Sequence, residues 1–334
     1  MPAESTWDTR RVRFVVFGAG AIGGVVGVQL YRAGHHATLV GRGRHLEVMQ
    51  RGGLTLETPQ ERATVDIPAV GSIAAADVGA DTAVLLTMKT QDTAPALEAL
   101  RRFADPATPI VCIQNGVENE RMALRLFHNV YGVSVMCPCV FLEPGVVQAF
   151  SAPTTGILDI GRYPEGEDDI AREIADALAT ATFVSQTRPD IMRWKYGKLI
   201  RNLRNAIEAA CGPEARDGRI RELVTTEAEQ VFTAAGIEYI SEAEDRKRRG
   251  GVLTPGRING AKRPGGSVWQ SLAREAGSIE TDYLSGHVAL LGRLYDVPTP
   301  ANSLLQALCA DMAAGKRELR SVDQEMFWRM MAGR

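Results

Sequence analysis

The chain has 334 residues, a formal net charge of −2, and a composition of 45% hydrophobic and 23% charged residues. Such a composition is typical of a soluble globular protein with one large or two ordinary domains, and the small net charge argues against nucleic acid or an anionic membrane as a partner. No apolar run approaches the roughly 20 residues that span a bilayer, and the polar residues 1–13 lack the apolar centre of a secretory signal, so a cytoplasmic protein is expected.

The five cysteines and five histidines show no pattern of a metal site or a disulfide framework. An odd number of cysteines suits a reducing compartment. Cys137 and Cys139 form a Cys-x-Cys pair, but no second pair or histidine cluster lies nearby in the sequence. We interpret them as small core residues in preference to a metal or redox site, and we expect no bound metal.

The first informative motif is a glycine turn between a strand and a helix. An apolar run at residues 14–17 leads directly into Gly-x-Gly-x-x-Gly, and a helical pattern follows. This order is typical of dinucleotide-binding domains, because backbone N–H groups and the positive end of the helix dipole point at the pyrophosphate. The expected cofactor contacts are Gly18, Gly20, Ala21, Ile22 and Gly23.

Short β-like runs alternate with helical stretches through the first half of the chain, which predicts a parallel sheet covered by helices. Residues 54–57 and 63–67 indicate a small antiparallel excursion, and residues 146–160 have further β character. Strands are expected at residues 13–17, 37–40, 82–87, 109–113 and 130–135. Helices are expected at residues 22–33, 44–51, 93–103 and 119–127.

The end of the second expected strand bears on which cofactor is bound. In NAD-binding domains an acidic residue at this point binds the ribose 2′-hydroxyl. Here the strand is followed by Gly41-Arg42-Gly43-Arg44, with no carboxylate. A guanidinium matches the oxygens of a 2′-phosphate, whereas cations at a helix N-terminus oppose its dipole. We therefore expect NADPH rather than NADH, with Arg42 as the main contact ahead of Arg44.

Two further polar sites follow expected strands, where ligands bind in open α/β sheets. Lys89 follows the run at residues 83–88, and Asn115-Gly116 follow the run at residues 110–114. An ordinary loop lysine, and a turn chosen for its tolerance of positive φ, explain these residues equally well.

The second half of the chain is predicted to be helical, which divides it into an NADP-binding domain at residues 11–186 and a helical substrate and dimerisation domain at residues 187–334. At about 100° per residue, a helix starting at Pro189 has one apolar stripe and one stripe expected to be solvated. Between the two run Lys198, Asn202 and Asn205, at i, i+4 and i+7. The apolar stripe is Met192, Tyr196, Leu199, Leu203, Ile207 and Ala210, and the solvated stripe is Gly197, Arg201, Arg204 and Glu208.

A lysine above two neutral amides suits a cleft, because amides orient a polar substrate and an ammonium group donates a proton. A merely exposed surface is the alternative. Further along the chain, residues 242–266 read as a solvated loop, or alternatively as a lid. Ser267 and Thr299 are expected to cap helices, and Glu280 follows Ser278 near the start of a helix that runs to about residue 295.

Five motifs together resemble the ketopantoate reductase family over nearly the whole chain. The resemblance implies an N-terminal Rossmann domain followed by an all-helical domain. It also implies NADPH-dependent reduction of 2-dehydropantoate (ketopantoate) to pantoate, a step toward pantothenate and coenzyme A. The motifs are Gly18-Ala-Gly20-Ala-Ile-Gly23, Met88-Lys89, Gln114-Asn115-Gly116, Lys198-Leu-Ile-Arg-Asn202 and Glu280-Thr-Asp-Tyr283.

The resemblance also implies roles for single residues. Lys198 resembles the family's general acid, which protonates the carbonyl oxygen, and Glu280 resembles the glutamate that hydrogen-bonds the substrate hydroxyl. The residues that resemble contacts of the nicotinamide or the substrate are Lys89, Asn115, Asn202, Asn205 and the carboxylate-binding Ser267. The expected partner is a small 2-keto acid, and a homodimer is left open.

Three departures from the family pattern concern the substrate. Asn205 comes one residue earlier than the family's Lys-Leu-x-x-Asn-x-x-x-Asn-Pro, and no proline follows it. Residues 133–141 lack a small, hydroxyl-rich pattern, and the basic segment 246–266 is unusual. Two alternatives therefore stay open: a reductase of a different branched 2-keto acid, and a non-catalytic NADPH-binding regulatory protein.

Overall fold

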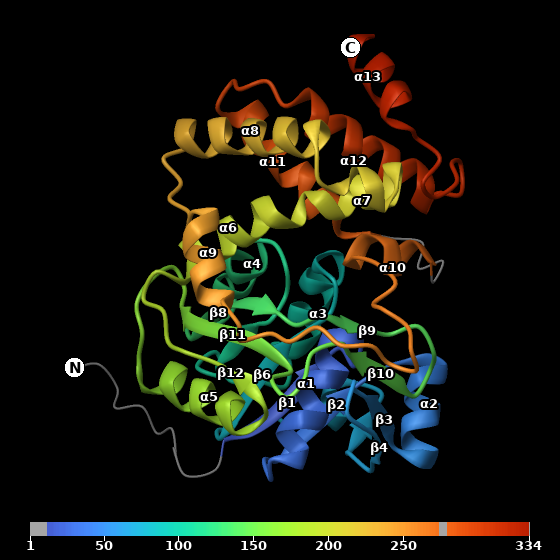
Figure 1. Cartoon of the computed structure of the whole chain (residues 1–334). Coiled ribbons are helices and arrows are strands. Elements are labelled where there is room, and N and C mark those ends of the chain that lie inside the picture. Colours follow the sequence, from blue (N-terminus) through green and yellow to red (C-terminus); the bar gives the residue numbers. More distant parts are fainter. Residues whose placement is uncertain (1–11, 274–278, 334) are drawn as a thin grey trace, which may run out of the picture. The chain divides into compact units, whose positions relative to one another are not determined.

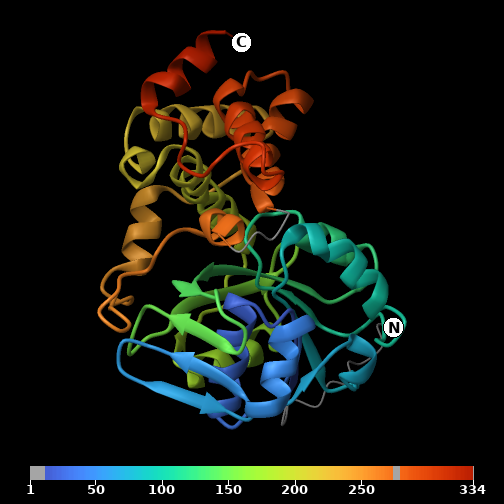
Figure 2. The same ribbon diagram turned by 90° about the vertical axis from the view of Figure 1, so that its right-hand side faces the viewer.

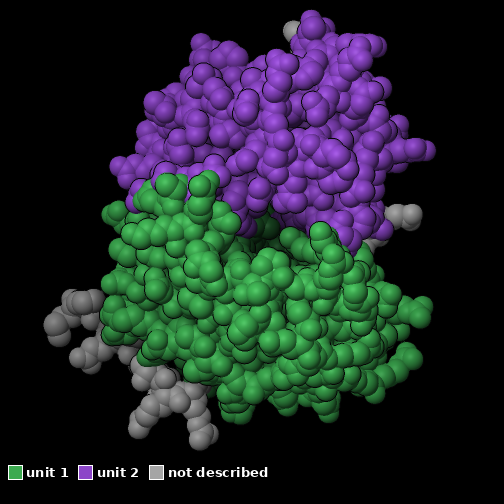
Figure 3. Space-filling view, viewed as in Figure 1, with its two compact units in different colours: residues 1–192, 243–263 green, residues 193–242, 264–334 purple. Residues whose placement is uncertain are grey.

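The computed structural model describes residues 12–273 and 279–333. The chain divides into two compact units, residues 1–192 with 243–263, and residues 193–242 with 264–334 (Figure 3). The boundary at residues 186 and 187 that we expect from the sequence stays a prediction about domains. In the described ranges, no helix is long and apolar enough to cross a bilayer.

The first unit is built on a mostly parallel sheet of eight strands, in the order β12-β11-β8-β7-β6-β1-β2-β5. Strand β1 pairs in parallel with β2 on one side and with β6 on the other. The strand order therefore reverses at β1, because β2 and β5 lie on one side of it and the later strands lie on the other. Only β11 against β8 is antiparallel among the described ladders of this sheet. The strands are β1 (Arg13–Phe17), β2 (Ala37–Val40), β5 (Ala69–Val70), β6 (Thr82–Leu86), β7 (Ile110–Cys112), β8 (Val130–Met136), β11 (Gly156–Arg162) and β12 (Phe183–Val184).

Helices cover both faces of this sheet, as the burial of a parallel sheet requires (Figure 1). Helices α1 (Ala21–Arg32) and α5 (Asp169–Thr180) contribute Val26 and Leu178 to the core on one face. Helices α3 (Thr93–Leu100) and α4 (Asn119–Leu124) contribute Leu97 and Ala123 to the core on the other. This arrangement confirms the α/β fold expected from the alternating pattern.

A second, smaller sheet has the order β4-β3-β10-β9. Its strands β3 (Leu54–Glu57) and β4 (Arg62–Val65) are antiparallel, which confirms the excursion expected from the sequence. Strand β10 (Val146–Ala149) joins β3 to the short β9 (Cys139–Val140), as Figure 2 shows beside the blue β3 and β4. Leu54, Leu56 and Val147 of this sheet belong to the same core as α1.

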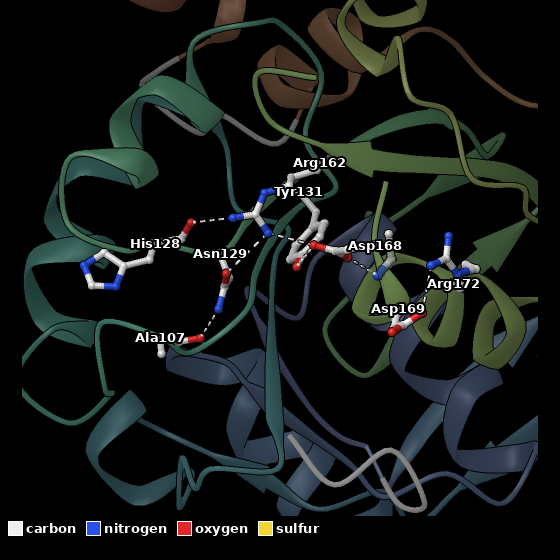
Figure 4. Close-up of polar contacts among 9 residues, drawn as sticks. Ala107, His128, Asn129, Tyr131, Arg162, Asp168, Asp169 and Arg172 are labelled. Atoms are coloured by element: carbon white, nitrogen blue, oxygen red, sulfur yellow. Dashed lines mark hydrogen bonds and ion pairs between the residues drawn. The ribbon is translucent and has the colours of Figure 1, made fainter. Parts of the chain in front are cut away.

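The start of α5 is fixed by a polar cluster on the first sheet (Figure 4). The Asp168 carboxylate caps the helix by accepting a hydrogen bond from the Ala171 N–H at 2.9 Å. It also accepts the Tyr131 hydroxyl at 2.9 Å and the Arg162 guanidinium at 2.7 Å. Burial and the neighbouring Asp168 raise the pKa of Tyr131, so this tyrosine stays a neutral donor.

The segment expected to be an irregular loop is partly helical, because α9 spans Glu242–Arg249. It is anchored to β11 through Asp159, which is fully buried. The Asp159 carboxylate accepts two hydrogen bonds from Arg248, at 2.7 and 2.6 Å, and one from Arg188 at 3.3 Å. Further along, Ile258 packs in a small core with Val140 and Phe150. The loop expectation was therefore wrong for residues 242–249.

The second unit is helical, as expected. The start of α12 is capped differently from the prediction: the Thr299 side chain makes no capping hydrogen bond, whereas the Glu227 carboxylate accepts the N–H groups of Ala301 and Asn302 at 2.8 and 2.9 Å. The elements are α6 (Ile191–Asn202), which begins in the first unit, α7 (Arg204–Cys211), η4 (Pro213–Arg216), α8 (Arg219–Ala234), α10 (Ser267–Ala273), η5 (Glu280–Tyr283), α11 (Ser285–Leu294), α12 (Pro300–Ala313) and α13 (Gln324–Ala332).

Candidate active site

The glycine turn after β1 leaves the N-terminus of α1 open. A Cβ atom at Gly18 would lie 2.8 Å from the Met88 backbone nitrogen, and one at Gly23 would collide with the Gly18 carbonyl oxygen. A Cβ atom at Gly20, in contrast, would meet nothing within 4 Å. No side chain caps the helix at Gly20, and no acidic residue lies in its first turn. This open, cation-like helix end fits a pyrophosphate held by backbone N–H groups at Ala21, Ile22 and Gly23.

Thr87 fixes this turn from the neighbouring strand end. Its hydroxyl lies 2.7 Å from the Gly18 carbonyl oxygen and donates a hydrogen bond to it. A Cβ at Gly23 would also collide with this hydroxyl. Thr87 was not predicted as a site residue, because the contact joins segments far apart in the sequence.

His45 is a second positioning residue that sequence reasoning missed. It lies on α2 (Gly43–Gly52). The Gly145 N–H donates to Nδ1 at 2.8 Å, so Nε2 carries the hydrogen and donates to the Ala19 carbonyl oxygen at 2.7 Å. The imidazole thus connects the glycine turn to the loop before β10.

Arg42 lies directly after β2, beside the glycine turn after β1. It is the residue before α2, and its side chain is 89% exposed. One guanidinium nitrogen lies 3.5 Å from the Asp92 carboxylate. Exposed pairs of this kind contribute little to stability, so a phosphate group can replace Asp92 as the partner of Arg42 at small cost. Arg44 is exposed as well.

Lys89 and Asn115 follow β6 and β7, the next strands along the same edge of the sheet. Gly116 has a φ of +80°, which confirms the expected positive-φ turn. Both loops are joined by a buried network. The Asn119 amide donates to the hydroxyl of Thr90, the residue after Lys89, at 3.3 Å and to the Asn115 carbonyl oxygen at 3.2 Å. Arg42, the glycine turn, Lys89 and Asn115 therefore follow four neighbouring parallel strands.

The expected helix from Pro189 is two helices in the structure. Its apolar stripe is correct, since Leu199, Leu203 and Ile207 are buried. The helix tightens at Leu203, however, where hydrogen bonds of the i to i+3 type run from the Leu203 N–H to the Ile200 oxygen and from the Ala206 N–H to the Leu203 oxygen, both at 3.2 Å. This turn separates α6 from α7.

The second stripe of this helix is only partly exposed, and Glu208 is buried, contrary to expectation. A Cβ atom at Gly197 would collide with Ile240, so glycine is needed for close packing there. Glu208 is buried, accepts the Gly266 N–H at 3.3 Å and pairs with Arg216 at 3.3 Å. Burial and the charges of neighbouring arginines lower the pKa of Arg204 to about 10.

The structure brings two predicted substrate contacts together in the second unit. The Asn205 amide lies 3.4 Å from the hydroxyl of Ser267, the first residue of α10. Asn202 is buried on the preceding helix, whereas Lys198 is partly exposed. A second lysine of α6, Lys195, is only 3% exposed, and no sequence motif singles it out.

Glu280 is buried, but it does not start a long helix. It begins the short η5, which precedes the separate helix α11, so the expected continuous helix to residue 295 was wrong. Ser278, two residues before Glu280, lies outside the described residues.

Among the described residues, no group of three or more histidine, cysteine, aspartate or glutamate side chains could hold a metal ion.

Two family models match the chain. Residues 14–165 match the model described as ketopantoate reductase PanE/ApbA, and residues 190–313 match its C-terminal counterpart. A 2-dehydropantoate 2-reductase of Pyrococcus horikoshii is 27% identical over 311 residues, which cover 89% of this chain and 96% of the relative. One of Mesorhizobium japonicum is 28% identical over 335 residues, with 90% and 98% covered.

Solved structures agree in fold. A PanE/ApbA family ketopantoate reductase from Ralstonia eutropha has a TM-score of 0.75 and 27% identity, covering 91% of this chain and 99% of its own. D-mandelate dehydrogenase with NADH and anilino(oxo)acetate has a TM-score of 0.77 over the same shares of the two chains, at 19% identity. The latter likeness concerns the fold alone.

Proposed function

Because the chain belongs to the ketopantoate reductase family, we propose that it reduces 2-dehydropantoate to pantoate with NADPH, a step toward pantothenate and coenzyme A. The observation that carries this proposal is the uncapped N-terminus of α1 beside Gly20, at the point where the strand order of a parallel sheet reverses. A cytoplasmic location and a homodimer stay predictions.

The residues after the parallel strands fit the parts of the cofactor. Backbone N–H groups in the first turn of α1 would hold the pyrophosphate, and Arg42 would hold the 2′-phosphate. Lys89 and Asn115 are proposed contacts nearer the nicotinamide. When bound, NADPH supplies a hydride to the keto carbon.

The residues of the second unit are assigned to the acceptor. In this proposal Lys198 stabilises the developing alkoxide and gives its proton to that oxygen. The amides of Asn202 and Asn205 orient the substrate, and the Ser267 hydroxyl donates to its carboxylate. Glu280 accepts a hydrogen bond from the substrate hydroxyl. The 3.4 Å contact between Asn205 and Ser267 supports their acting on one molecule.

We expect Arg42→Ala to raise the Kd of NADPH by about 10- to 100-fold, because hydrogen bonds to a charged group contribute about 1.5–3 kcal/mol. The Kd of NADH should change little, since NADH lacks the 2′-phosphate. Fluorescence titration with both cofactors measures this difference, and Arg44→Ala serves as the matched control with a smaller effect. Equal losses for the two cofactors would contradict the contact.

His45→Ala should raise the Kd of NADPH about fivefold, because a typical hydrogen bond contributes about 1 kcal/mol and its loss frees the Ala19 carbonyl at the glycine turn. Turnover at saturating NADPH should be unchanged. His128→Ala, an exposed histidine of the same unit, is the control and should leave the Kd unaltered. A fall in kcat without a change in Kd would show that His45 acts elsewhere.

The substrate is tested by measuring NADPH oxidation with ketopantoate and a panel of branched 2-keto acids. The highest kcat/KM is expected with ketopantoate. Activity with another acid alone would keep the reductase class and reject the substrate. Binding of NADPH without turnover of any acid would support the regulatory alternative instead.

A further inference from the structure

Cys137 and Cys139 are held together by a tight turn of the backbone. The Cys139 N–H donates to the Cys137 carbonyl oxygen at 2.9 Å, which closes a three-residue γ-turn around Pro138. The Phe150 N–H fixes this turn by donating to the Pro138 oxygen at 2.8 Å. Such a turn brings the flanking Cα atoms closer than an extended strand does, toward the separation that a disulfide needs.

The two side chains also interact with each other. Their hydrogen bond, together with the positive charges of Arg263 and Lys89, lowers the pKa of the Cys139 thiol against the opposing effect of burial. Gly156 leaves room for this arrangement, since a Cβ there would lie 3.0 Å from the Cys137 Cβ. Both cations belong to the first unit, so the positive surroundings are built into that unit.

Two other cysteines, Cys211 and Cys309, have thiol pKa values shifted in the opposite direction from that of Cys139. Burial raises the pKa of Cys211 to about 11 and that of Cys309 to about 12. Because the thiolate is the reactive form, these thiols are slow to react at neutral pH. Cys137 is partly exposed, whereas Cys139 is buried. An oxidant from solvent therefore meets Cys137 first.

We propose that Cys137 and Cys139 form a redox-modification site that hydroperoxides convert reversibly to a disulfide. The Cys137 thiol first passes its proton to the hydrogen-bonded Cys139 thiolate. A hydroperoxide then transfers an oxygen to the resulting Cys137 thiolate, giving a sulfenic acid, and its other oxygen leaves as the alcohol, or as water when the oxidant is hydrogen peroxide, after taking up a proton. Cys139 then attacks the sulfenic sulfur, the S–S bond forms, and water leaves. Overall, two thiols are oxidised by two electrons and the peroxide bond is reduced.

The disulfide can be detected by peptide mass, without measuring any enzymatic activity. Trypsin places both cysteines on the peptide of residues 126–162, whereas Cys112, Cys211 and Cys309 fall on three other peptides. The folded protein is treated with hydrogen peroxide, denatured in an alkylating agent, digested without reductant and weighed by mass spectrometry. We expect the 126–162 peptide to lack the mass of two hydrogen atoms and to resist alkylation, and the peptide with Cys211 to be alkylated. Reduction of the oxidised protein with dithiothreitol before alkylation should restore two alkylation sites on this peptide.

Single substitutions supply the controls. Cys139→Ser should leave Cys137 as a sulfenic acid, which a dimedone probe traps, and Cys211→Ser should form the disulfide as the wild type does. The proposal is overturned if the wild-type 126–162 peptide stays doubly alkylated, or is oxidised to sulfinic acid without bridging. A bridge from either cysteine to Cys112, Cys211 or Cys309 would overturn it too.

Discussion

Replacement of Lys198 by alanine is expected to lower kcat by about 10²–10⁴, the usual contribution of a positioned general acid. The reason is chemical: hydride addition to a keto carbon places negative charge on its oxygen, and the proposed ammonium group neutralises that charge. Steady-state rates with ketopantoate and saturating NADPH measure the loss. The Kd of NADPH should stay within about twofold of the wild-type value, because Lys198 is not assigned to the cofactor.

The variant Lys198→Arg tests whether the side chain at this position acts through its positive charge alone or also by donating a proton. Arginine keeps a positive charge but holds its proton too tightly to donate it near neutral pH. The variant should therefore retain a KM close to the wild type and a kcat close to Lys198→Ala. Lys195, buried on the same helix, tests the assignment. Loss of turnover in Lys195→Met, with full activity in Lys198→Ala, would transfer the role to Lys195.

Much of the first unit follows from local sequence. The strands β1 and β2 have the residue bounds that their apolar runs predict, and the antiparallel β3 and β4 were also recognisable. Buried parallel strands are short apolar runs ended by glycine or polar residues, and this signal does not depend on distant partners. The residues that follow those strands come to one edge by topology alone, so Arg42, Lys89 and Asn115 were predictable as a group.

The errors concern features that distant segments decide. The charged run of α9 looks solvated, yet Arg248 pairs with Asp159, 89 residues earlier in the sequence. Gly197 and Glu208 were assigned to a solvated stripe because Ile240 and Gly266, which cover them, are remote in sequence. The helix break at Leu203 could not be predicted, because no glycine or proline lies at that position. His45 and Thr87 likewise bind backbone carbonyls of the glycine motif, but each belongs to a segment outside that motif.

Asp159→Ala should destabilise the protein by about 3–5 kcal/mol, the cost of removing one partner of a buried ion pair. The Asp159 side chain is fully buried and that of Arg248 is 10% exposed, so the substitution leaves a largely desolvated guanidinium without the carboxylate that it faces. The anchor of α9 on β11 is lost with it. Urea titration followed by circular dichroism measures the stability. Limited proteolysis should show faster cleavage within residues 243–263.

An exposed aspartate of the same unit provides the comparison. Asp169 is 85% exposed and pairs with Arg172 at 2.7 Å, a distance like that between Asp159 and Arg248. Because water solvates both side chains of this pair, Asp169→Ala should lower the free energy of unfolding by less than about 1 kcal/mol. The two pairs thus differ in burial more than in geometry. Equal losses in the two variants, or unchanged proteolysis of residues 243–263 in Asp159→Ala, would mean that the buried pair does not hold this segment on the sheet.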